Sequence, residues 1–321
     1  MTKTLALGLD LGGTKIAAGV VDSGGRLFSN VRLATPASGL SRDLAALFDA
    51  AHAAVSAARV SWKSIRAVGV GVPGAFDPKT ETVWAPNLPG WKKVPLKRLL
   101  EKALRRPTFV EGDRNVQALA EAWLASDRPR NLVFLTVGTG IGAGLIADGR
   151  LIAGTRGVAG AAGWLAIDSR WRGEFGRIGC LEFVGAGPAV ARLAENALRK
   201  RARSLIRTIG EKRGGKITAE VVAAAARQGD ATARRVLEEV GSNLGRGVAG
   251  IISLLNPDVV VLGGGLARAG DFILRPLRRA ARQWGQPLAT RQVRIVRSEL
   301  GEDAGILGAA RYAFMKLEEK P

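Results

Sequence analysis

The stretch LGLDLGGTKIAAGVVD, residues 7–22, places a glycine pair between two apolar runs. The runs TLALGLD (4–10) and IAAGVVD (16–22) are each short enough to form a buried strand, and a third apolar run comes after a second glycine pair. Short apolar runs separated by glycine pairs are typical of strands joined by tight turns. The sequence therefore predicts a meander of three strands at the N-terminal end.

The same arrangement returns in NLVFLTVGTGIGAGLIADGRLIAG, residues 131–154. Segments with helical spacing of apolar residues and further short strands follow each copy. After the first copy we expect strands at 65–74 and 107–113 and helices at 41–59, 95–104 and 114–126. After the second copy we expect strands at 258–265 and 292–296 and helices at 184–209, 217–228, 230–255, 269–283 and 304–317.

A motif that occurs twice predicts an α/β protein of two related domains with a cleft between them. The polar segment 126–131 is suited to a place near their boundary. We assign residues 1–118 together with 303–321 to a small N-terminal domain that carries the first glycine turn. We assign residues 119–302 to a large domain that carries the second glycine turn and a later glycine cluster.

Both glycine turns, DLGGTK (10–15) and TVGTGIGAG (136–144), combine glycines with a threonine hydroxyl. Glycine lets backbone N–H groups approach a phosphate closely and permits a positive φ. We therefore predict phosphate binding at both turns, with a simple glycine hairpin as the alternative for either turn alone. The second turn formally matches G-x-G-x-x-A, but the alternating GLIADGRLI (144–152) after it predicts a strand, whereas a dinucleotide-binding fingerprint opens a helix.

A third glycine cluster, Gly263, Gly264 and Gly265, follows the apolar strand VVVL. Loops at the ends of strands commonly hold ligands in open α/β folds. The cluster is suited to packing against a nucleoside, and an ordinary strand-to-helix turn is the alternative.

One cysteine and one histidine restrict the chemistry of the chain. Cys180 can form no disulfide within the chain, and His52 lies in an Ala-rich helical segment without a nucleophile motif that points to it. A zinc site with several histidines is excluded, and a Ser-His-Asp or Cys-His mechanism is not indicated. Since no apolar run suggests a secretory signal or a membrane span, we expect a cytoplasmic protein.

The net charge of +20 is spread along the chain but is densest between Arg199 and Lys216. Anionic partners such as polyphosphate would fit this segment, and a solvated basic surface is the alternative. No aromatic residue interrupts the segment, so a base-stacking surface and a specific nucleic-acid partner are not expected.

Taken in order, the motifs of the chain resemble those of the ROK family of sugar kinases, repressors and open reading frames, within the actin/hexokinase-like superfamily. The resemblance covers essentially the whole chain. No helix-turn-helix segment precedes the first motif, so the resemblance is to the kinases. It rests on LGLDLGGTKIAAGVVD (7–22), GVGVPGAFD (69–77), APNLPGW (85–91), GDRNVQALAEA (112–122), LTVGTGIGAGLIADGRL (135–151), GCLE (179–182), NPDVVVLGGG (256–265) and DAGILGAA (303–310).

The resemblance implies two ribonuclease H-like domains and an ATP-dependent, glucokinase-like phosphorylation of a sugar hydroxyl by a homodimer. Asp113 matches the family's catalytic base, which accepts the hydroxyl proton as the new bond forms, and a helix N-cap is the alternative role. Asp10 would help to position Mg²⁺, indirectly. The implied ATP-binding residues are Asp10, Gly12, Gly13, Thr14, Lys15, Thr136, Gly138, Thr139, Gly140, Gly263, Gly264 and Gly265. The implied sugar-binding residues are Gly74, Asn87, Gly112, Asp113, Ala161, Trp164 and Glu182.

The sugar-binding half departs from the family pattern at three positions. Gly112 stands where the family has Asn, Ala161 where it has Glu, and Trp164 where it has His. These residues cannot replace the side chains that bind sugar hydroxyls, so an ordinary hexose should bind weakly. Glu182 and Asn87 remain for polar contacts, and Trp164 or Trp91 would offer a stacking face.

The family's zinc pattern is also incomplete, because the segment reads GEFGRIGCLE (173–182) and keeps one cysteine. One cysteine cannot hold a tetrahedral structural zinc, so we predict no zinc. We expect Trp164 and Phe175 to fill the vacated volume together by apolar packing.

Three functions remain open at this stage. The first is an active ATP-dependent kinase with an altered acceptor, such as a modified sugar, a smaller polyol or a more apolar substrate. The second is a catalytically degenerate protein that binds ATP or a sugar. The third is a sugar kinase that uses polyphosphate as its donor. Dimerisation through the apolar helix 236–255 is compatible with each of them.

Overall fold

The computed structural model describes residues 4–199 and 203–319 and divides the chain into two compact units. The first unit comprises Met1–Arg130, Gly144–Ala159 and Leu300–Pro321, and the second comprises Asn131–Ala143 and Gly160–Glu299. The expected division near residue 118 would have cut helix α3 (Asp113–Leu124), which packs along its length on α12 (Ala304–Glu318) in the first unit.

The first unit contains a five-stranded sheet with the order β3-β2-β1-β4-β7. Its inner strand β1 pairs in antiparallel fashion with β2 and in parallel fashion with β4. All five strands lie at or near their expected positions, whereas the short hairpin of β5 (Ala75–Asp77) and β6 (Thr82–Trp84) was not expected. The strands of the sheet are β1 (Leu5–Leu11), β2 (Lys15–Asp22), β3 (Val31–Ala34), β4 (Ile65–Val72) and β7 (Thr108–Gly112).

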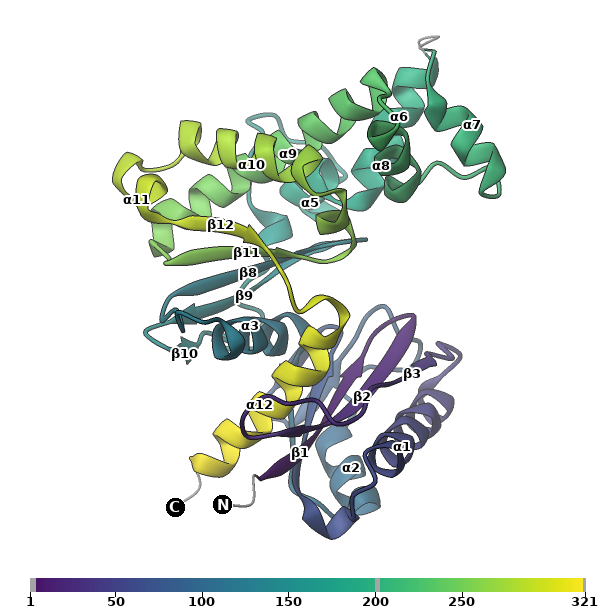
Figure 1. The fold of residues 1–321 in the computed structure, drawn as a ribbon, viewed down its shortest axis with the longest axis vertical. Coiled ribbons are helices and arrows are strands. Elements are labelled where there is room, and N and C mark those ends of the chain that lie inside the picture. The colour runs from purple at the N-terminus through teal and green to yellow at the C-terminus, as the bar shows by residue number, and fades with distance from the viewer. Residues whose placement is uncertain (1–3, 200–202, 320–321) are drawn as a thin grey trace. The chain divides into compact units, whose positions relative to one another are not determined.

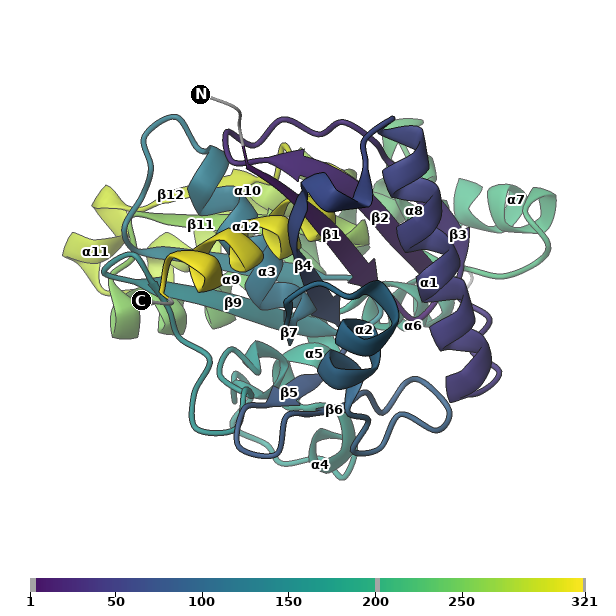
Figure 2. The same cartoon turned by 90° about the horizontal axis from the view of Figure 1, so that it is seen from below.

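The two faces of this sheet carry side chains of different size. Large residues of β1 such as Leu7 and Leu9 are buried on the face that is covered by α1 (Leu40–Ala57) and α2 (Leu96–Leu104). Small residues line the other face, where α12 lies directly on the strands (Figure 2). A Cβ atom on Gly8 would lie 2.1 Å from the carbonyl oxygen of Ile306 in α12, so the glycine is required for this close approach.

The second sheet, with the order β10-β9-β8-β11-β12, repeats the topology of the first. In both sheets the five strands follow the spatial order third, second, first, fourth, fifth in chain sequence. The expected duplication is therefore confirmed. The end of β9 and the whole of β10 lie in segment 144–159, which groups with the first unit. The strands are β8 (Leu132–Val137), β9 (Ile141–Ala147), β10 (Arg150–Leu151), β11 (Val259–Gly263) and β12 (Arg294–Arg297).

Helices form most of the remainder of the second unit, where α9 and α10 run side by side (Figure 1). The single helix expected over 184–209 is wrong, because extended backbone at Ala186 and Ser204 divides the segment. In the described part of the chain, no helix combines the length and the apolar character that a membrane span needs. The helices are α4 (Phe175–Ile178), α5 (Cys180–Gly185), α6 (Gly187–Arg199), α7 (Leu205–Lys212), α8 (Ala219–Arg227), α9 (Ala231–Leu255), α10 (Asp271–Trp284) and α11 (Pro287–Gln292).

Candidate active site

The first glycine turn joins β1 to β2 and is fixed by hydrogen bonds to its own backbone. The Gly12 amide donates to the Lys15 carbonyl at 2.8 Å, and the Thr35 hydroxyl donates to the Gly12 carbonyl at 2.7 Å. Neither Gly12 nor Gly13 adopts the positive φ that glycine permits. Space explains the glycine instead, because a Cβ on Gly12 would lie 2.9 Å from the Lys15 oxygen. Gly13 and Thr14 remain exposed at the tip of the turn.

Asp10 lies near the end of β1, on the face of the sheet that carries α12. Period-two alternation places it there with Gly8, two residues before it. Glycines give its carboxyl room on two sides: a Cβ on Gly305, in the first turn of α12, would lie 2.1 Å from Oδ2, and a Cβ on Gly71 would lie 3.3 Å from Oδ1. The carboxyl therefore occupies a narrow space between β4 and the start of α12.

Burial first, and then the nearby carboxyl of Asp113, raise the pKa of Asp10, whereas the cations Lys15 and Arg32 lower it, and the net result is a pKa of about 7. Two partly buried carboxyl groups thus influence each other within the first unit. A carboxyl with this pKa exchanges its proton close to neutral pH, and a bound cation would favour the charged form.

Asp113 begins α3, directly after the end of β7. The N-cap position belongs to Gly112, and the Oδ1 atom of Asp113 accepts a 2.7 Å hydrogen bond from the Arg114 amide. Burial raises the pKa of Asp113, and the hydrogen bond and charge of Arg114 oppose that change. A carboxylate with a raised pKa is a better proton acceptor near neutral pH than an ordinary one.

Glu111 precedes these residues, is almost fully buried and was not predicted from the sequence. Its Oε1 atom accepts hydrogen bonds from the Gly112 amide at 2.8 Å and from the Asn115 side chain at 3.0 Å. Glu111 therefore ties the end of β7 to the first turn of α3, where Asp113 lies. An acidic residue inside the apolar run FVEGD (109–113) was the available signal.

The other predicted sugar-binding residues of the first unit lie on loops and at a strand end. Gly74 has a φ of 140°, and a Cβ there would lie 2.1 Å from the Trp84 oxygen, so this position requires glycine. Position 112 does not require glycine, because the atom nearest to an added Cβ would be the Gly74 carbonyl oxygen, 3.4 Å away. Asn87 is exposed on the loop after β6.

The second glycine turn, between β8 and β9, follows the design of the first. The Gly138 amide donates to the Gly140 carbonyl at 2.9 Å, and the Gly187 amide at the start of α6 donates to the Gly138 carbonyl at 2.8 Å. Neither Gly138 nor Gly140 has a positive φ. A strand follows the turn, which confirms that it is not a dinucleotide-binding fingerprint. Thr136 precedes the turn within β8.

A cavity of about 450 Å³ in the second unit brings the second turn and the third glycine cluster together. Gly138 and Thr139 line it from one side and Gly265 from another. Gly263 and Gly264 have packing roles beside it, since added Cβ atoms would lie 2.3 Å from the Phe134 ring and 2.5 Å from the Val137 oxygen. The sequence did not indicate the remaining lining residues, which come from the start of α6 and α8 and from the loop after β11: Gly187, Pro188, Ala191, Ile217, Thr218, Ala219, Glu220 and Leu266.

Glu182 in α5 is held against the second turn. Its Oε2 atom accepts a 2.7 Å hydrogen bond from the Ile141 amide. Glycines leave room for this carboxyl on two sides. An added Cβ would lie 2.8 Å from Oε2 at Gly140 and 2.9 Å from it at Gly163. Burial raises the pKa of this half-buried carboxyl, and the Ile141 hydrogen bond opposes the shift.

The aromatic residues of the second unit do not pack as expected. Phe175 is buried, but its ring partners are Trp171 and Phe183, with centroids 6.1 and 5.6 Å away. Trp164 is 56% exposed, so the prediction that it fills a buried volume with Phe175 is wrong. Its indole is instead free to contact a ligand, and Ala161 nearby in sequence is exposed as well.

The indole of Trp91 is not available for stacking on a ligand. Trp91 is fully buried and donates from Nε1 to Asp43 at 2.9 Å, so the predicted stacking role is wrong.

Cys180 is buried, and its Sγ atom lies 3.4 Å from the Ile167 amide nitrogen. Within the described residues, no three His, Cys, Asp or Glu side chains gather as a metal site would require. The absence of zinc stays a prediction.

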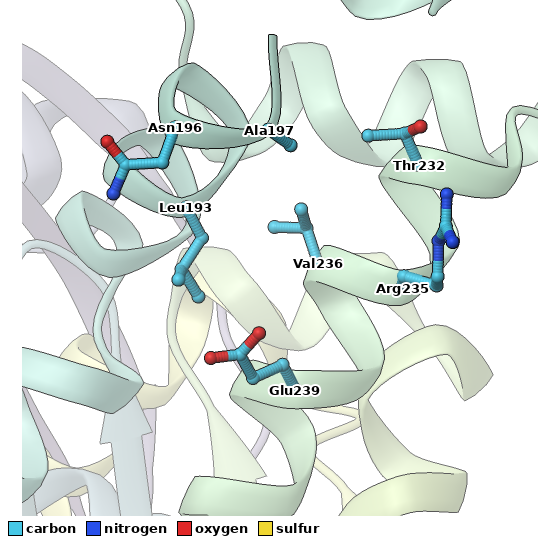
Figure 3. A pocket seen from close by; sticks show the side chains of 7 residues that line it. All are labelled: Leu193, Asn196, Ala197, Thr232, Arg235, Val236 and Glu239. Carbon is cyan, nitrogen blue, oxygen red and sulfur yellow. The ribbon is translucent and has the colours of Figure 1, made fainter. Parts of the chain in front are cut away.

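A separate cavity of about 430 Å³ lies between α6 and α9 (Figure 3). It contains none of the predicted site residues. Its walls mix aliphatic and charged side chains, namely Leu193, Asn196, Ala197, Thr232, Arg235, Val236 and Glu239.

The sequence is similar to known proteins over nearly its whole length. Residues 6–315 match the model of the ROK family. The glucokinase of Thermotoga maritima is 34% identical over 313 residues, which are 97% of this chain and 97% of that relative. A ROK hexokinase from Thermus thermophilus is 35% identical with a TM-score of 0.78, covering 98% of this chain and 99% of that one. A ROK family glucokinase from Streptomyces griseus, solved with glucose and AMPPNP, is 33% identical with a TM-score of 0.79, covering 97% and 99%.

Proposed function

Because this chain belongs to the ROK family, we propose that it transfers a phosphoryl group from ATP to a hydroxyl of a sugar whose recognition differs from that of glucose. The chain is a carbohydrate kinase with the actin/hexokinase-like fold. The Streptomyces griseus relative was solved with an ATP analogue, which supports ATP as the donor here. The observation that carries the proposal is that the chain retains the partly buried carboxyl of Asp113, while the residues at several predicted sugar-binding positions have changed.

Asp113 accepts the proton of the attacking hydroxyl in this mechanism. Its place at the junction of β7 and α3, tied by Glu111, fixes the carboxyl, and its raised pKa favours proton acceptance near neutral pH. Phosphoryl transfer otherwise depends on positioning and charge neutralisation. The exposed turn residues Gly13, Thr14 and Thr139 suit the phosphates, and the cavity lined by Thr139 and Gly265 suits the nucleoside.

Magnesium is implied by the family, and Asp10 is the residue that would hold it, through water. A carboxylate oxygen is a ligand that Mg²⁺ prefers, and a bound cation would keep Asp10 ionised despite its raised pKa. Bound Mg²⁺ would neutralise charge on the transferred phosphate.

The acceptor differs from an ordinary hexose in this proposal. Gly112 and Ala161 have no side chain that can bind a hydroxyl, whereas Glu182 offers a carboxyl and the exposed Trp164 a flat apolar face. A modified sugar, a smaller polyol or a more apolar acceptor suits such a set.

Polyphosphate is a second candidate donor, and one observation favours it. Lys216 ends the basic segment and directly precedes Ile217, which lines the cavity assigned to the nucleoside. Lys200 and Arg201 of that segment lie outside the described residues.

A non-catalytic role in binding ATP or a sugar is the remaining alternative. Turnover distinguishes an active kinase from such a protein.

A cytoplasmic homodimer stays a prediction. The apolar face of α9 is buried in its own unit, with Leu244 and Val248 fully covered, so the helix cannot offer that face to a second copy. Leu254 at its end is 83% exposed, and Trp284 and Leu288 are each 62% exposed. We propose these three residues as the contact of a dimer.

A phosphoryl-transfer screen tests the function. ATP and polyphosphate are each offered with a panel of sugars and polyols, and phosphorylated products are detected by mass spectrometry. We expect ATP-dependent product with at least one acceptor, and a fall in kcat of about 10²–10⁴-fold in Asp113→Asn. Asp49→Asn, an exposed position on α1, is the matched control and should keep full activity. Turnover that survives Asp113→Asn would refute the proposed mechanism.

A further inference from the structure

A second cavity of the first unit, about 570 Å³ in volume, has no part in the reaction described above. Its walls come from the hairpin β5–β6 and its loop, the end of β7, segment 149–157 and α12. Cavities of this size commonly hold a small molecule. Its base includes Glu111 and Tyr312, and its charged residues include Arg150 and Lys316.

The base of this cavity can bind hydroxyl groups. Glu111 is only 6% exposed, and Tyr312 shares a hydrogen bond with its carboxyl. Burial raises the pKa of Tyr312 first of all, and the charge of Glu111 adds to the rise, so the phenol stays protonated, donates to Glu111 and leaves its oxygen to accept from a ligand hydroxyl. A carboxylate and a phenol beside the ring of Phe76 are groups that bind a sugar, since hydroxyls satisfy the polar atoms and C–H groups cover the ring.

The cations of the cavity can bind an anion. Arg150 is exposed, and the Lys316 ammonium lies 5.6 Å from the centroid of the Tyr312 ring. Lys316 also pairs with Glu319 at 2.6 Å, but both side chains are partly exposed, at 34% and 57%. Such a pair contributes little to stability, so a phosphate can replace Glu319 at small cost.

We propose that this cavity is a binding site for a small sugar phosphate. Its hydroxyls bind Glu111 and Tyr312, and its phosphate binds Arg150 and Lys316. The site is separate from the phosphoryl-transfer residues, and ligand binding there requires neither ATP nor turnover.

Glu111 connects the proposed site to the catalytic base. The same carboxyl holds the Gly112 amide and the Asn115 side chain, which fix the start of α3 at Asp113. Sugar hydroxyls that compete for this carboxyl loosen both hydrogen bonds. Occupancy of the site should therefore lower kcat without changing the KM for ATP.

Isothermal titration of the full chain in the absence of ATP tests the site, with glucose 6-phosphate as the probe and with glucose and inorganic phosphate as separate arms. We expect glucose 6-phosphate to bind more tightly than either arm. The double variant Arg150→Gln/Lys316→Gln should weaken its Kd by about tenfold or more. Asp113→Asn, which alters only the acceptor site, should leave the Kd unchanged. Equal unfolding midpoints of all variants show that the fold is kept.

Three results would overturn the site. The first is the absence of glucose 6-phosphate binding up to about 10 mM, since a weaker affinity would not be specific. The second is an unchanged Kd for glucose 6-phosphate in the double variant. The third is loss of binding in Asp113→Asn, which would place the probe in the acceptor site. Tighter binding of inorganic phosphate than of glucose 6-phosphate would overturn the sugar part of the proposal. None of these readouts depends on phosphoryl transfer, so the proposed function stands or falls separately.

Discussion

Asp10 shows how a single side chain can be costly for folding and, in the proposed function, useful for catalysis. Its side chain is partly buried, and its pKa is raised from 3.8 to about 7, chiefly by burial and then by Asp113. Active sites often contain carboxyls that are shifted in this way, because catalysis needs groups that exchange protons or bind cations near neutral pH.

The raised pKa of Asp10 sets the sign of a pH effect on stability. The folded chain keeps a proton that the unfolded chain releases, so folding is weakened as the pH rises from about 4 to about 7. Asp10→Asn removes this penalty. Without Mg²⁺, the free energy of unfolding of Asp10→Asn near pH 8 should exceed that of the wild type by up to about 4 kcal/mol. This difference should vanish near pH 4.

Urea unfolding at the two pH values measures this difference. The exposed Asp49→Asn is the control and should match the wild type at both. An Asp10→Asn gain that does not depend on pH would mean that Asp10 titrates normally in the folded chain. The same variant should lose activity, because no carboxylate is left at the proposed magnesium position.

Individual site residues were predictable from the sequence to different degrees. Asp10, Asp113 and Glu182 stand in recognisable motifs, and the structure encloses each of them partly or fully. Glu111 was missed, because nothing in a strand pattern says that one acidic residue will be buried and tied to the next helix. Trp164 was expected to be buried, but burial depends on neighbours that a local sequence does not name.

At the scale of elements, α12 and β1 fit together through glycines. A Cβ on Gly305 would lie 2.1 Å from Oδ2 of Asp10 and 2.4 Å from its Cγ. The start of α12 therefore fixes where the carboxyl can be. This contact joins residues almost three hundred positions apart in sequence, so a sequence motif alone could not reveal it.

Gly305→Ala tests that contact. The new methyl group must push the Asp10 carboxyl aside, and a displacement of about 1 Å at a positioned group can cost about 10²-fold in kcat. Gly250→Ala is the matched control, because Gly250 lies exposed on α9 with no atom within 4 Å of an added Cβ. The control should keep its kcat and gain up to about 1 kcal/mol in stability. Equal kcat values for both variants would show that the Gly305 contact does not position Asp10.

Local patterns predicted most elements, and tertiary contacts explain the failures. The apolar spacing over 184–209 continues through Ala186 as if one helix ran on, yet the Gly187 amide donates to the Gly138 carbonyl of the second turn. That long-range bond ends α5 and starts α6, and it brings α6 to the cavity proposed for the nucleoside. Close neighbours likewise explain Gly12 and Gly140 in the two turns, whereas an added Cβ on Gly13 or Gly138 would meet no atom within 4 Å.

At the scale of the whole molecule, the duplication was visible in the sequence because each copy begins with the same strand and glycine pattern. The shared spatial order of the two sheets confirms it. The limits of the two units were less predictable. They depend on helices such as α3 that pack on elements far along the chain.

In the proposed function, the residues that would bind ATP and the residues that would bind the sugar have different histories. The glycine turns, Asp10 and Asp113 match the family pattern, whereas Gly112 and Ala161 stand where hydroxyl-binding side chains are expected. The structure has room to restore them, since an added Cβ on Gly112 has no neighbour closer than 3.4 Å and Ala161 is exposed. Each restored hydrogen bond to a charged or polar group is worth roughly 0.5–3 kcal/mol.

The proposed change in the acceptor half is tested most directly by steady-state kinetics, with glucose and ATP varied in turn. The wild type is compared with the double variant Gly112→Asn/Ala161→Glu. We predict that the two substitutions lower the KM for glucose by about tenfold or more, as one or two such bonds would, and leave the KM for ATP unchanged. A wild type that already phosphorylates glucose with a KM that the substitutions do not lower would contradict the claim that the acceptor half has changed.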